Sequence, residues 1–224
     1  MDTEIWSEVD AYVNRLVVPS DRTLEAVLAA TAAAGLPPIQ VSPSQGRLLQ
    51  ILARLSGARA ILEIGTLGAY STIWMARALP SGGELVTLEA DPRHAAVARA
   101  NLVQAGLEGI VSVVEGRAQD TLAEIAASGR SPFDMVFIDA DKTGYPEYFR
   151  WALRMTRAGS LIVADNVIRG GAVVDTTRSD ADVQGVRGFL ELIAAEPRVE
   201  ATVIQTVGAK GYDGLALALV LPAP

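Results

Sequence analysis

Short apolar runs rich in β-branched residues alternate with amphipathic segments from residue 60 onward, and this alternation constrains the fold more than any other feature. Strands that are apolar on both faces and separated by helices are typical of a parallel sheet covered on both sides. The sequence therefore predicts an α/β fold. The expected strands are 60–64, 85–88, 110–114, 135–138 and 161–164, and the expected helices between them lie near 71–79, 92–106, 119–128 and 146–156.

The two ends of the chain extend this pattern within a single predicted domain, 1–224. Residues 1–58 show helical spacing with breaks near Pro19 and Gly35, which predicts a helical N-terminal extension. The tail predicts one helix and two more strands that are joined by a hairpin loop. We expect the helix near 183–195, the strands at 199–206 and 214–220, the hairpin loop at 208–214, and a mobile surface loop at 168–182, where no periodicity is visible.

Composition excludes several classes of function. The chain has no cysteine and a single histidine, His94, which rules out thiolate catalysis, zinc-thiolate sites and multi-histidine metal centres. A formal net charge of −7 argues against a nucleic-acid partner. No basic region precedes an apolar core at the start, and no apolar run approaches the ~20 residues that span a bilayer. We therefore expect a cytoplasmic protein with no membrane partner.

The first predicted strand ends in a glycine-rich turn that leads into a helix. Gly65 and Gly68 stand in this turn, but the dinucleotide fingerprint G-x-G-x-x-G is absent. Glu63 favours a cationic ligand over a pyrophosphate, and S-adenosylmethionine carries both a sulfonium and an amino group. The alternative is an ordinary tight turn with a solvated glutamate.

The second and third strand ends carry further polar residues. Glu89, at the end of the second strand, is placed to accept both ribose hydroxyls of an adenosine. Asp91 is expected to cap the next helix, which starts with Pro92. Gln119 follows the third strand and either flanks an adenine edge or simply starts a helix. Glu89, too, has the alternative of being merely exposed.

Three oxygen-bearing side chains follow the fourth and fifth strands. A crossover between these strands makes them neighbours, so Asp139, Asp165 and Asn166 could converge on one point. Such hard oxygen ligands suit Mg²⁺, Ca²⁺ or Mn²⁺. Lys142 is a candidate general base beside such a cation. Alternatively, the two aspartates and Asn166 are helix N-caps, and Lys142 is a surface residue. Spacing alone does not decide whether these residues bind a metal ion.

In their order and spacing these motifs resemble the metal-dependent class I O-methyltransferases. This family includes plant caffeoyl-CoA O-methyltransferases, their bacterial relatives and, more distantly, catechol O-methyltransferase. The similarity covers Val41 to Val167 together with Tyr212-Asp213-Gly214. Its most specific parts are Glu63-Ile64-Gly65-Thr66 with Tyr70-Ser71, Ile138-Asp139-Ala140-Asp141-Lys142, and Ala164-Asp165-Asn166-Val167-Ile168.

The resemblance implies a fold, a cofactor and a set of site residues. The fold is a Rossmann-like, seven-stranded and mostly parallel sheet with an antiparallel last strand and helices on both faces, often in a homodimer. Residues 1–58 are expected to contribute to a lid over the substrate and to the dimer. The implied metal ligands are Asp139, Asp165 and Asn166, with Mg²⁺ first, and Lys142 acts with Asp139 in catalysis. The implied contacts to S-adenosylmethionine are Val41, Glu63, Gly65, Ser71, Glu89, Ala118, Gln119 and Asp139.

Two positions depart from the family pattern. Ala69 stands where glycine is usual before the Tyr-Ser pair, and we expect the turn to remain intact. Gly144 stands where asparagine is usual, and we expect it to loosen the lip of the substrate pocket.

The predicted activity is methyl transfer from S-adenosylmethionine to one hydroxyl of an ortho-dihydroxy aromatic small molecule, assisted by a divalent cation. Two other functions stay open at this point. One is a nicotinamide-dependent oxidoreductase on a Rossmann sheet, against which the missing third glycine and Glu63 count. The other is a non-catalytic module that binds S-adenosylmethionine.

Overall fold

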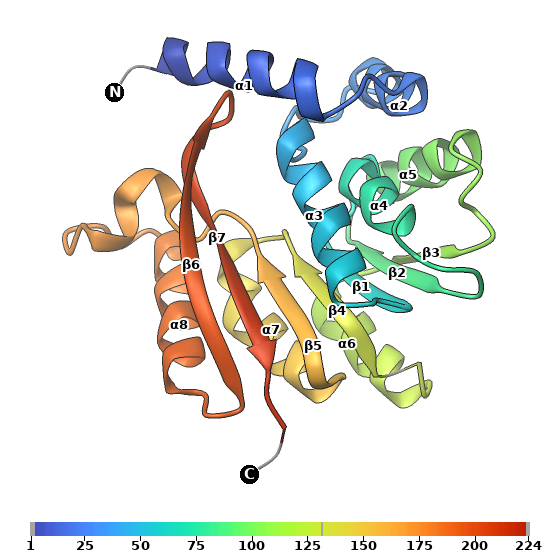
Figure 1. Ribbon diagram of the computed structural model, residues 1–224. Helices are drawn as coiled ribbons and strands as arrows, with labels where there is room; N and C mark the ends of the chain where they lie inside the picture. Colours follow the sequence, from blue (N-terminus) through green and yellow to red (C-terminus); the bar gives the residue numbers. More distant parts are fainter. Residues whose placement is uncertain (1–2, 131, 223–224) are drawn as a thin grey trace.

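The computed structural model describes residues 3–130 and 132–222, and in this part of the chain seven strands form one sheet in the order β3-β2-β1-β4-β5-β7-β6 (Figure 1). β7 runs antiparallel to both of its neighbours, and the pairs from β3 to β5 are parallel. The predicted mostly parallel sheet with an antiparallel last strand is confirmed. The strands are β1 (Ala60–Ile64), β2 (Glu84–Glu89), β3 (Val111–Glu115), β4 (Phe133–Ile138), β5 (Thr156–Ala164), β6 (Val199–Gly208) and β7 (Gly211–Val220).

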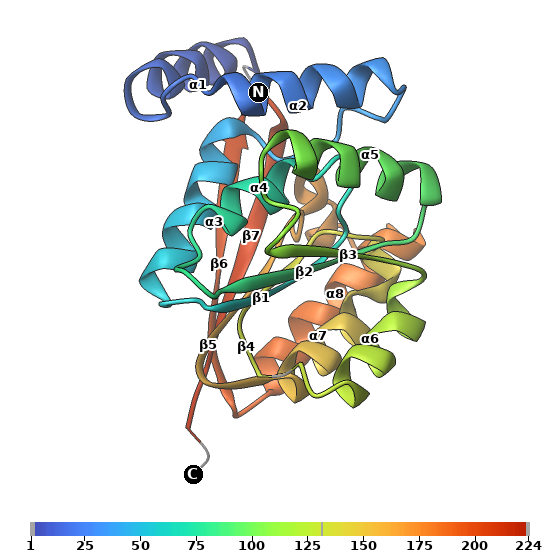
Figure 2. The same ribbon diagram turned by 90° about the vertical axis from the view of Figure 1, so that its right-hand side faces the viewer.

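Helices cover both faces of the sheet, as predicted from the doubly apolar strands. Figure 2 shows α6, α7 and α8 on one side and α3, α4 and α5 on the other, and each group packs into its own buried apolar cluster. Every residue of β4 is buried because this central strand faces both clusters. The helices are α1 (Thr3–Val17), α2 (Arg22–Ala33), α3 (Pro43–Leu55), α4 (Tyr70–Ala76), α5 (Pro92–Gln104), α6 (Ala118–Ala127), α7 (Tyr145–Arg154) and α8 (Ala181–Ala195), with short 3₁₀ turns at Lys142–Gly144 and Arg169–Val174.

The N-terminal extension consists of three helices, as predicted, and reaches over the edge where the parallel strands end (Figure 1). α2 braces the turn after β1, because the Asn101 side chain donates both to Thr31 Oγ1 at 3.2 Å and to the Gly68 carbonyl at 2.9 Å. α1 has no buried residue and lies against the tip of the β6–β7 hairpin, where Asp10 accepts from the Ala209 amide at 2.8 Å. The extension therefore encloses space above the sheet edge.

The predicted hairpin loop at 208–214 is wrong in its extent. β6 and β7 pair up to Gly208 opposite Gly211, so only Ala209 and Lys210 lie between the strands. Gly211 has φ +93°, a left-handed conformation that favours glycine and lets the chain reverse tightly. Tyr212 and Asp213 continue the ladder.

The segment 168–182 is more ordered than the sequence predicts. It contains the 3₁₀ turn Arg169–Val174, and Asp213 Oδ1 accepts from the amides of Ile168 and Arg169. Arg187 of α8 donates to several carbonyls of the segment, including that of Val173 at 3.0 Å. These partners lie far away in the sequence, so local periodicity does not reveal them. Among the described residues no helix is long and apolar enough to cross a membrane.

Candidate active site

Two adjoining cavities open where the parallel strands end. The first cavity, of about 660 Å³, lies over the ends of β1, β2 and β4, and the second cavity, of about 520 Å³, lies between the end of β5, the β6–β7 hairpin and the N-terminal extension. Both volumes are in the range of small-molecule sites. The residues that line both cavities are Ile39, Gln40, Val41, Asn166 and Arg169.

The turn after β1 forms one wall of the first cavity. Gly65 has φ +100°, and a Cβ at this position would lie 2.0 Å from the Asp139 carbonyl oxygen. Only glycine therefore lets the ends of β1 and β4 come this close. Ala69, at the same turn, has φ +65° and is fully buried, so the alanine that replaces the usual glycine keeps the turn in a left-handed conformation that is strained for it.

Glu63 lies beneath this wall and does not line either cavity. Its buried carboxylate accepts from the Ser71 hydroxyl at 2.6 Å, from the Thr87 hydroxyl at 2.7 Å and from the Thr72 hydroxyl. Burial raises the pKa of Glu63 to about 7 against the opposing effect of these hydrogen bonds, and the charge of Asp139 adds to the rise. Ser71 lines the first cavity, so Glu63 reaches a ligand only through it.

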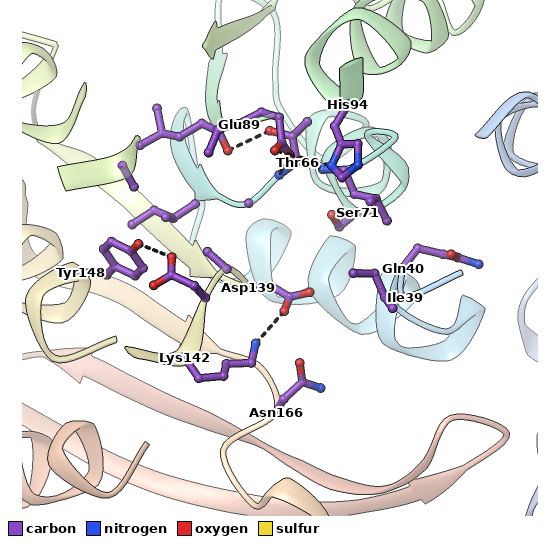
Figure 3. Close-up of a pocket in the computed structure, with 18 of the residues that line it drawn as sticks. Ile39, Gln40, Thr66, Ser71, Glu89, His94, Asp139, Lys142, Tyr148 and Asn166 are labelled. Carbon is purple, nitrogen blue, oxygen red and sulfur yellow. Dashed lines mark hydrogen bonds and ion pairs between the residues drawn. The ribbon is translucent and has the colours of Figure 1, made fainter. Parts of the chain in front are cut away.

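Glu89 ends β2 inside the first cavity and organises the loops around it. Its carboxylate accepts from the amides of Leu67 at 2.8 Å and Asp91 at 2.9 Å, and more weakly from that of Thr66. His94 Nδ1 lies 3.6 Å from Glu89 Oε1 (Figure 3). A carboxylate has about four acceptor positions, so capacity for a ligand hydroxyl remains.

Gln119 and Tyr148 close the far end of the first cavity. Tyr148 Oη donates to Asp141 Oδ1, and Gln119 Nε2 lies 3.4 Å from the same phenol oxygen. Burial raises the pKa of Tyr148 above its usual range, so this phenol stays a neutral donor. Gly144 is buried, and a Cβ there would lie 2.3 Å from the Tyr148 ring. The glycine makes room for Tyr148, so the expected loosening at this position is not seen.

Lys142 and Asp139 meet in the wall of the first cavity. Lys142 Nζ donates to Asp139 Oδ1 at 3.0 Å and to Tyr145 Oη at 2.6 Å, although its side chain is only 8% exposed. Tyr145 Oη in turn lies 2.9 Å from the Asp165 carbonyl and 3.2 Å from the Ile138 carbonyl. Burial raises the pKa of Tyr145 well above its usual range, so its hydroxyl keeps its proton and holds the amine in place.

Asp139, Asp165 and Asn166 lie at the neighbouring ends of β4 and β5, as predicted. Burial raises the pKa of Asp165 to about 7, and the charge of Asp139 raises it further. Asn166 has φ +55°, which asparagine tolerates better than most residues, and its backbone N–H donates to Asp165 Oδ1 at 2.7 Å. Figure 3 shows Lys142 and Asn166 extending toward Asp139.

This set of donors fits a hard divalent cation. The charge of Asp139 raises the pKa of the buried Asp165, and a positive ion between the two carboxylates would relieve this repulsion. The side-chain amide oxygen of Asn166 completes three oxygen donors. Among the described residues no three carboxylate or imidazole side chains gather around one point, so the predicted set depends on the amide of Asn166 together with Asp139 and Asp165.

Most of the predicted site residues meet at the two cavities. Asp165 lines the second cavity. Of the predicted site residues only Glu63 lines neither cavity, because its side chain points from β1 toward α4 and β2. The predicted residues that line the first cavity are Val41, Gly65, Ser71, Glu89, Ala118, Gln119, Asp139, Lys142 and Asn166.

Sequence reasoning missed several lining residues. His94, to which we assign no chemistry from the sequence, lines the first cavity, and its place in the first turn of the helix after Glu89 is the signal that could have revealed it. The walls of the second cavity come from α1, the 38–42 segment and the β6–β7 hairpin. No local pattern connects such distant segments.

Comparisons with known proteins agree on one family. The family model described as O-methyltransferase matches residues 16–222. The catechol O-methyltransferase of Niastella koreensis is 53% identical over 220 residues, which cover 98% of this chain and 100% of that protein. The catechol O-methyltransferase of Mycobacterium tuberculosis is 51% identical, with 95% of both chains covered.

Solved structures agree with the sequence relatives. The Bacillus cereus O-methyltransferase in complex with SAH superposes with a TM-score of 0.96 at 56% identity, over 97% of this chain and 99% of that one. The O-methyltransferase TomG from Streptomyces achromogenes, involved in tomaymycin synthesis and solved in complex with SAM, has a TM-score of 0.95 at 51% identity, over 99% of both chains.

The buried carboxyl of Glu63 predicts a pH dependence of stability. Because its pKa rises from 4.5 in the unfolded chain to about 7 in the folded protein, the folded state binds this proton more tightly. Stability is therefore fully present below pH 4.5 and decreases as the pH rises toward 7, by roughly 3 kcal/mol for this group. Urea unfolding of the wild type and Glu63→Gln, without divalent cations or cofactor, should show the variant gaining on the wild type between pH 5 and 8.

The difference between the two proteins cancels the contribution of Asp165, whose pKa is also raised and which both proteins retain. A constant difference in unfolding free energy across this pH range would contradict the assignment of the shift to Glu63.

Proposed function

The chain belongs to the O-methyltransferase family and is an S-adenosylmethionine-dependent O-methyltransferase, and we propose that it methylates one hydroxyl of an ortho-dihydroxy aromatic small molecule with the help of a divalent cation. Family membership decides against the nicotinamide-dependent oxidoreductase. The relatives named catechol O-methyltransferase support a catechol-type acceptor.

One observation carries the proposal: the two cavities meet at the predicted metal ligands. Asp139 lines the first cavity, Asp165 lines the second, and Asn166 lines both. A methyl donor in the first cavity and an acceptor in the second would then face each other across these three side chains. Transfer between two bound molecules requires such a juxtaposition, since the reacting atoms must come within about 3–3.5 Å.

The first cavity suits S-adenosylmethionine. Glu89 offers its remaining acceptor position to a ribose hydroxyl, and Ala118 and Gln119 lie at the proposed adenine position. Val41, Gly65 and Ser71 form the wall at the proposed methionine end. Glu63, in hydrogen-bond contact with Ser71, lies behind this wall, and in its ionised form it would favour the cationic ligand.

Asp139, Asp165 and Asn166 would hold the divalent cation, with Mg²⁺ as the first choice and Ca²⁺ or Mn²⁺ as alternatives. A dication held there supplies Lewis-acid chemistry, which lowers the pKa of a phenol hydroxyl and orients a vicinal diol. The protein contributes the rest of the geometry, because the strand ends fix the two carboxylates and the left-handed backbone of Asn166 sets the direction of its amide.

Lys142 is the proposed general base. Its amine lies between Asp139 and Tyr145 in the wall of the first cavity, and in its neutral form it would accept the proton of the hydroxyl that becomes methylated. Tyr145 holds the amine without competing for the proton, since its own pKa is raised. Phenolate and sulfonium charges cancel during transfer, so the remaining task of the site is to orient both molecules and to exclude water.

Activity and chelation test the proposed reaction. Purified protein with S-adenosylmethionine, Mg²⁺ and a catechol such as caffeic acid should form a methyl ether, because the site holds both reactants and the cation. Excess EDTA should abolish product formation, and added Mg²⁺ should restore it. Product formation that persists undiminished in EDTA would contradict the metal role, and cofactor binding without turnover on any catechol would favour a non-catalytic binding module.

Replacement of Lys142 tests the general base. Lys142→Met should lower kcat on the order of 100-fold or more, since it removes the proton acceptor. The dissociation constant for S-adenosylmethionine, measured by calorimetry, should stay close to the wild-type value. Lys142→Arg is the matched control, because arginine can keep the ion pair with Asp139 but cannot take up a proton. An Arg variant with wild-type kcat would show that position 142 supplies charge and no base.

The N-terminal extension is proposed to act as part of a substrate lid and as a dimer contact. Asp10, Pro38 and Ser42 already line the second cavity, which supports the lid. For the dimer, α1 exposes apolar side chains at helical spacing, and no residue of this helix is buried. A second copy of the chain would cover this face. The exposed apolar residues of α1 that support this proposal include Val9, Tyr12, Val13, Leu16 and Val17.

Charge substitutions on α1 test the dimer. Light scattering at micromolar concentration should give the mass of two chains for the wild type and of one chain for Val9→Asp/Leu16→Asp, because the carboxylates would be buried without partners. Glu8→Gln, on the same helix, is the control and should leave the mass unchanged. A wild-type protein that elutes and scatters as a monomer would contradict the dimer.

A further inference from the structure

The sequence contains only two lysines, Lys142 and Lys210, and each lines one of the two cavities. All other basic side chains apart from His94 are arginines. Lys142 lies in the first cavity and has its place in the proposed reaction. Lys210 lies in the second cavity, on the side of the hairpin, and the reaction described above leaves it without a role.

The structure fixes Lys210 at the wall of the second cavity. It stands in the two-residue turn between β6 and β7, and the amide of its neighbour Ala209 is bound by Asp10 at 2.8 Å. The Lys210 ammonium donates one hydrogen bond, to the Pro38 carbonyl at 2.7 Å. An ammonium group has three N–H donors, so two are available to a ligand.

Lys210 has no carboxylate within 4.0 Å among residues 3–130 and 132–222. The other lysine, Lys142, forms an ion pair with Asp139. Arg169, which also lines the second cavity, forms an ion pair with Asp182 at 3.2 Å. Partial burial lowers the pKa of Lys210, and no neighbouring charge opposes this effect.

Two of the carboxylates that line the same cavity are already engaged by backbone amides. Asp10 accepts from Ala209, and Asp213 Oδ1 accepts from the amides of Ile168, Arg169 and Gly214. The second cavity therefore presents a partly desolvated cation at its hairpin wall and the carboxylate of Asp165 at its floor. Apolar side chains, among them Val41, Leu48 and Leu215, lie along the same cavity.

We propose that the methyl acceptor carries a carboxylate at the end remote from its diol, and that Lys210 recognises this carboxylate and so determines acceptor specificity. The inference rests on the proposed function, because it places the diol at Asp139, Asp165 and Asn166. The aromatic ring then lies along the apolar wall, and the carboxylate accepts from the free N–H groups of Lys210. A cavity of about 520 Å³ holds a molecule of this kind.

Matched pairs of acceptors test the proposal. The probes are 3,4-dihydroxybenzoate and caffeate, each compared with its methyl ester, which keeps the diol and removes the negative charge. For the wild type, kcat/KM for at least one acid should exceed that of its ester by roughly fivefold, the scale of one ion pair at a half-exposed site. Lys210→Met should abolish this preference by raising KM for the acid, while kcat and the kinetics of the ester stay unchanged.

Two variants and a binding measurement complete the design. Lys210→Arg should keep the preference for the acid, and Arg150→Met, at an exposed position of α7 that lines neither cavity, should behave as the wild type. Calorimetric titration of the acid into protein with Mg²⁺ and S-adenosylhomocysteine should show the same loss of affinity in Lys210→Met.

The outcomes separate this inference from the proposed function. Equal use of acid and ester by the wild type, an unchanged acid-to-ester ratio in Lys210→Met, or a preference for the coenzyme A thioester of caffeate over free caffeate would each overturn the role of Lys210 and leave the methyl transfer intact. Failure of the wild type to methylate any of these acceptors would overturn the proposed function itself, and the inference with it.

Discussion

Asp139 and Asp165 end two neighbouring parallel strands, and both carboxylates are held in a place where neither is fully hydrated. The register of β4 and β5 sets this proximity, because Ile138 pairs with Ala164 and the next residue of each strand is the aspartate. Two negative charges brought together in this way favour a cation between them. In the structure the ammonium group of Lys142 provides a positive charge there, through its ion pair with Asp139.

The surrounding architecture follows from the need to keep this point rigid and accessible from two sides. Gly65 allows β1 to approach Asp139 closely, and the first cavity opens on that side. On the other side the long β6–β7 hairpin rises to meet α1 and the 38–42 segment, and these contacts enclose the second cavity. Methyl donor and acceptor can thus be bound by different parts of the chain and still meet at the same strand ends.

Much of this could be predicted from the sequence, because buried strands and helices leave a local record in hydrophobic periodicity. Strand 60–64 agrees with β1 at both ends, and Asp139, Lys142 and Asn166 fall where the strand-end rule places them. The direction of a side chain is harder to predict from the sequence. Glu63 is at a strand end, yet its carboxylate points into the core toward Ser71 and Thr87. The alternation of a strand fixes two faces, and tertiary packing decides which face meets the ligand.

Other features depend on contacts between distant residues and so had no local signature. Arg187 and Asp213 order the segment after β5, and Lys210 contacts Pro38, which lies 172 positions earlier in the sequence. The sequence predicts too long a hairpin loop because glycine and aspartate are typical of turns, although here Gly211, Asp213 and Gly214 continue a paired ladder.

The most direct measurement of the central claim is the position of a bound ion. Crystals grown with Mn²⁺ and S-adenosylhomocysteine, examined by anomalous scattering at the manganese edge, should show one manganese peak contacted by Asp139, Asp165 and Asn166, at the junction of the two cavities. A manganese peak elsewhere, or none at this junction while the cofactor fills the first cavity, would contradict the claim.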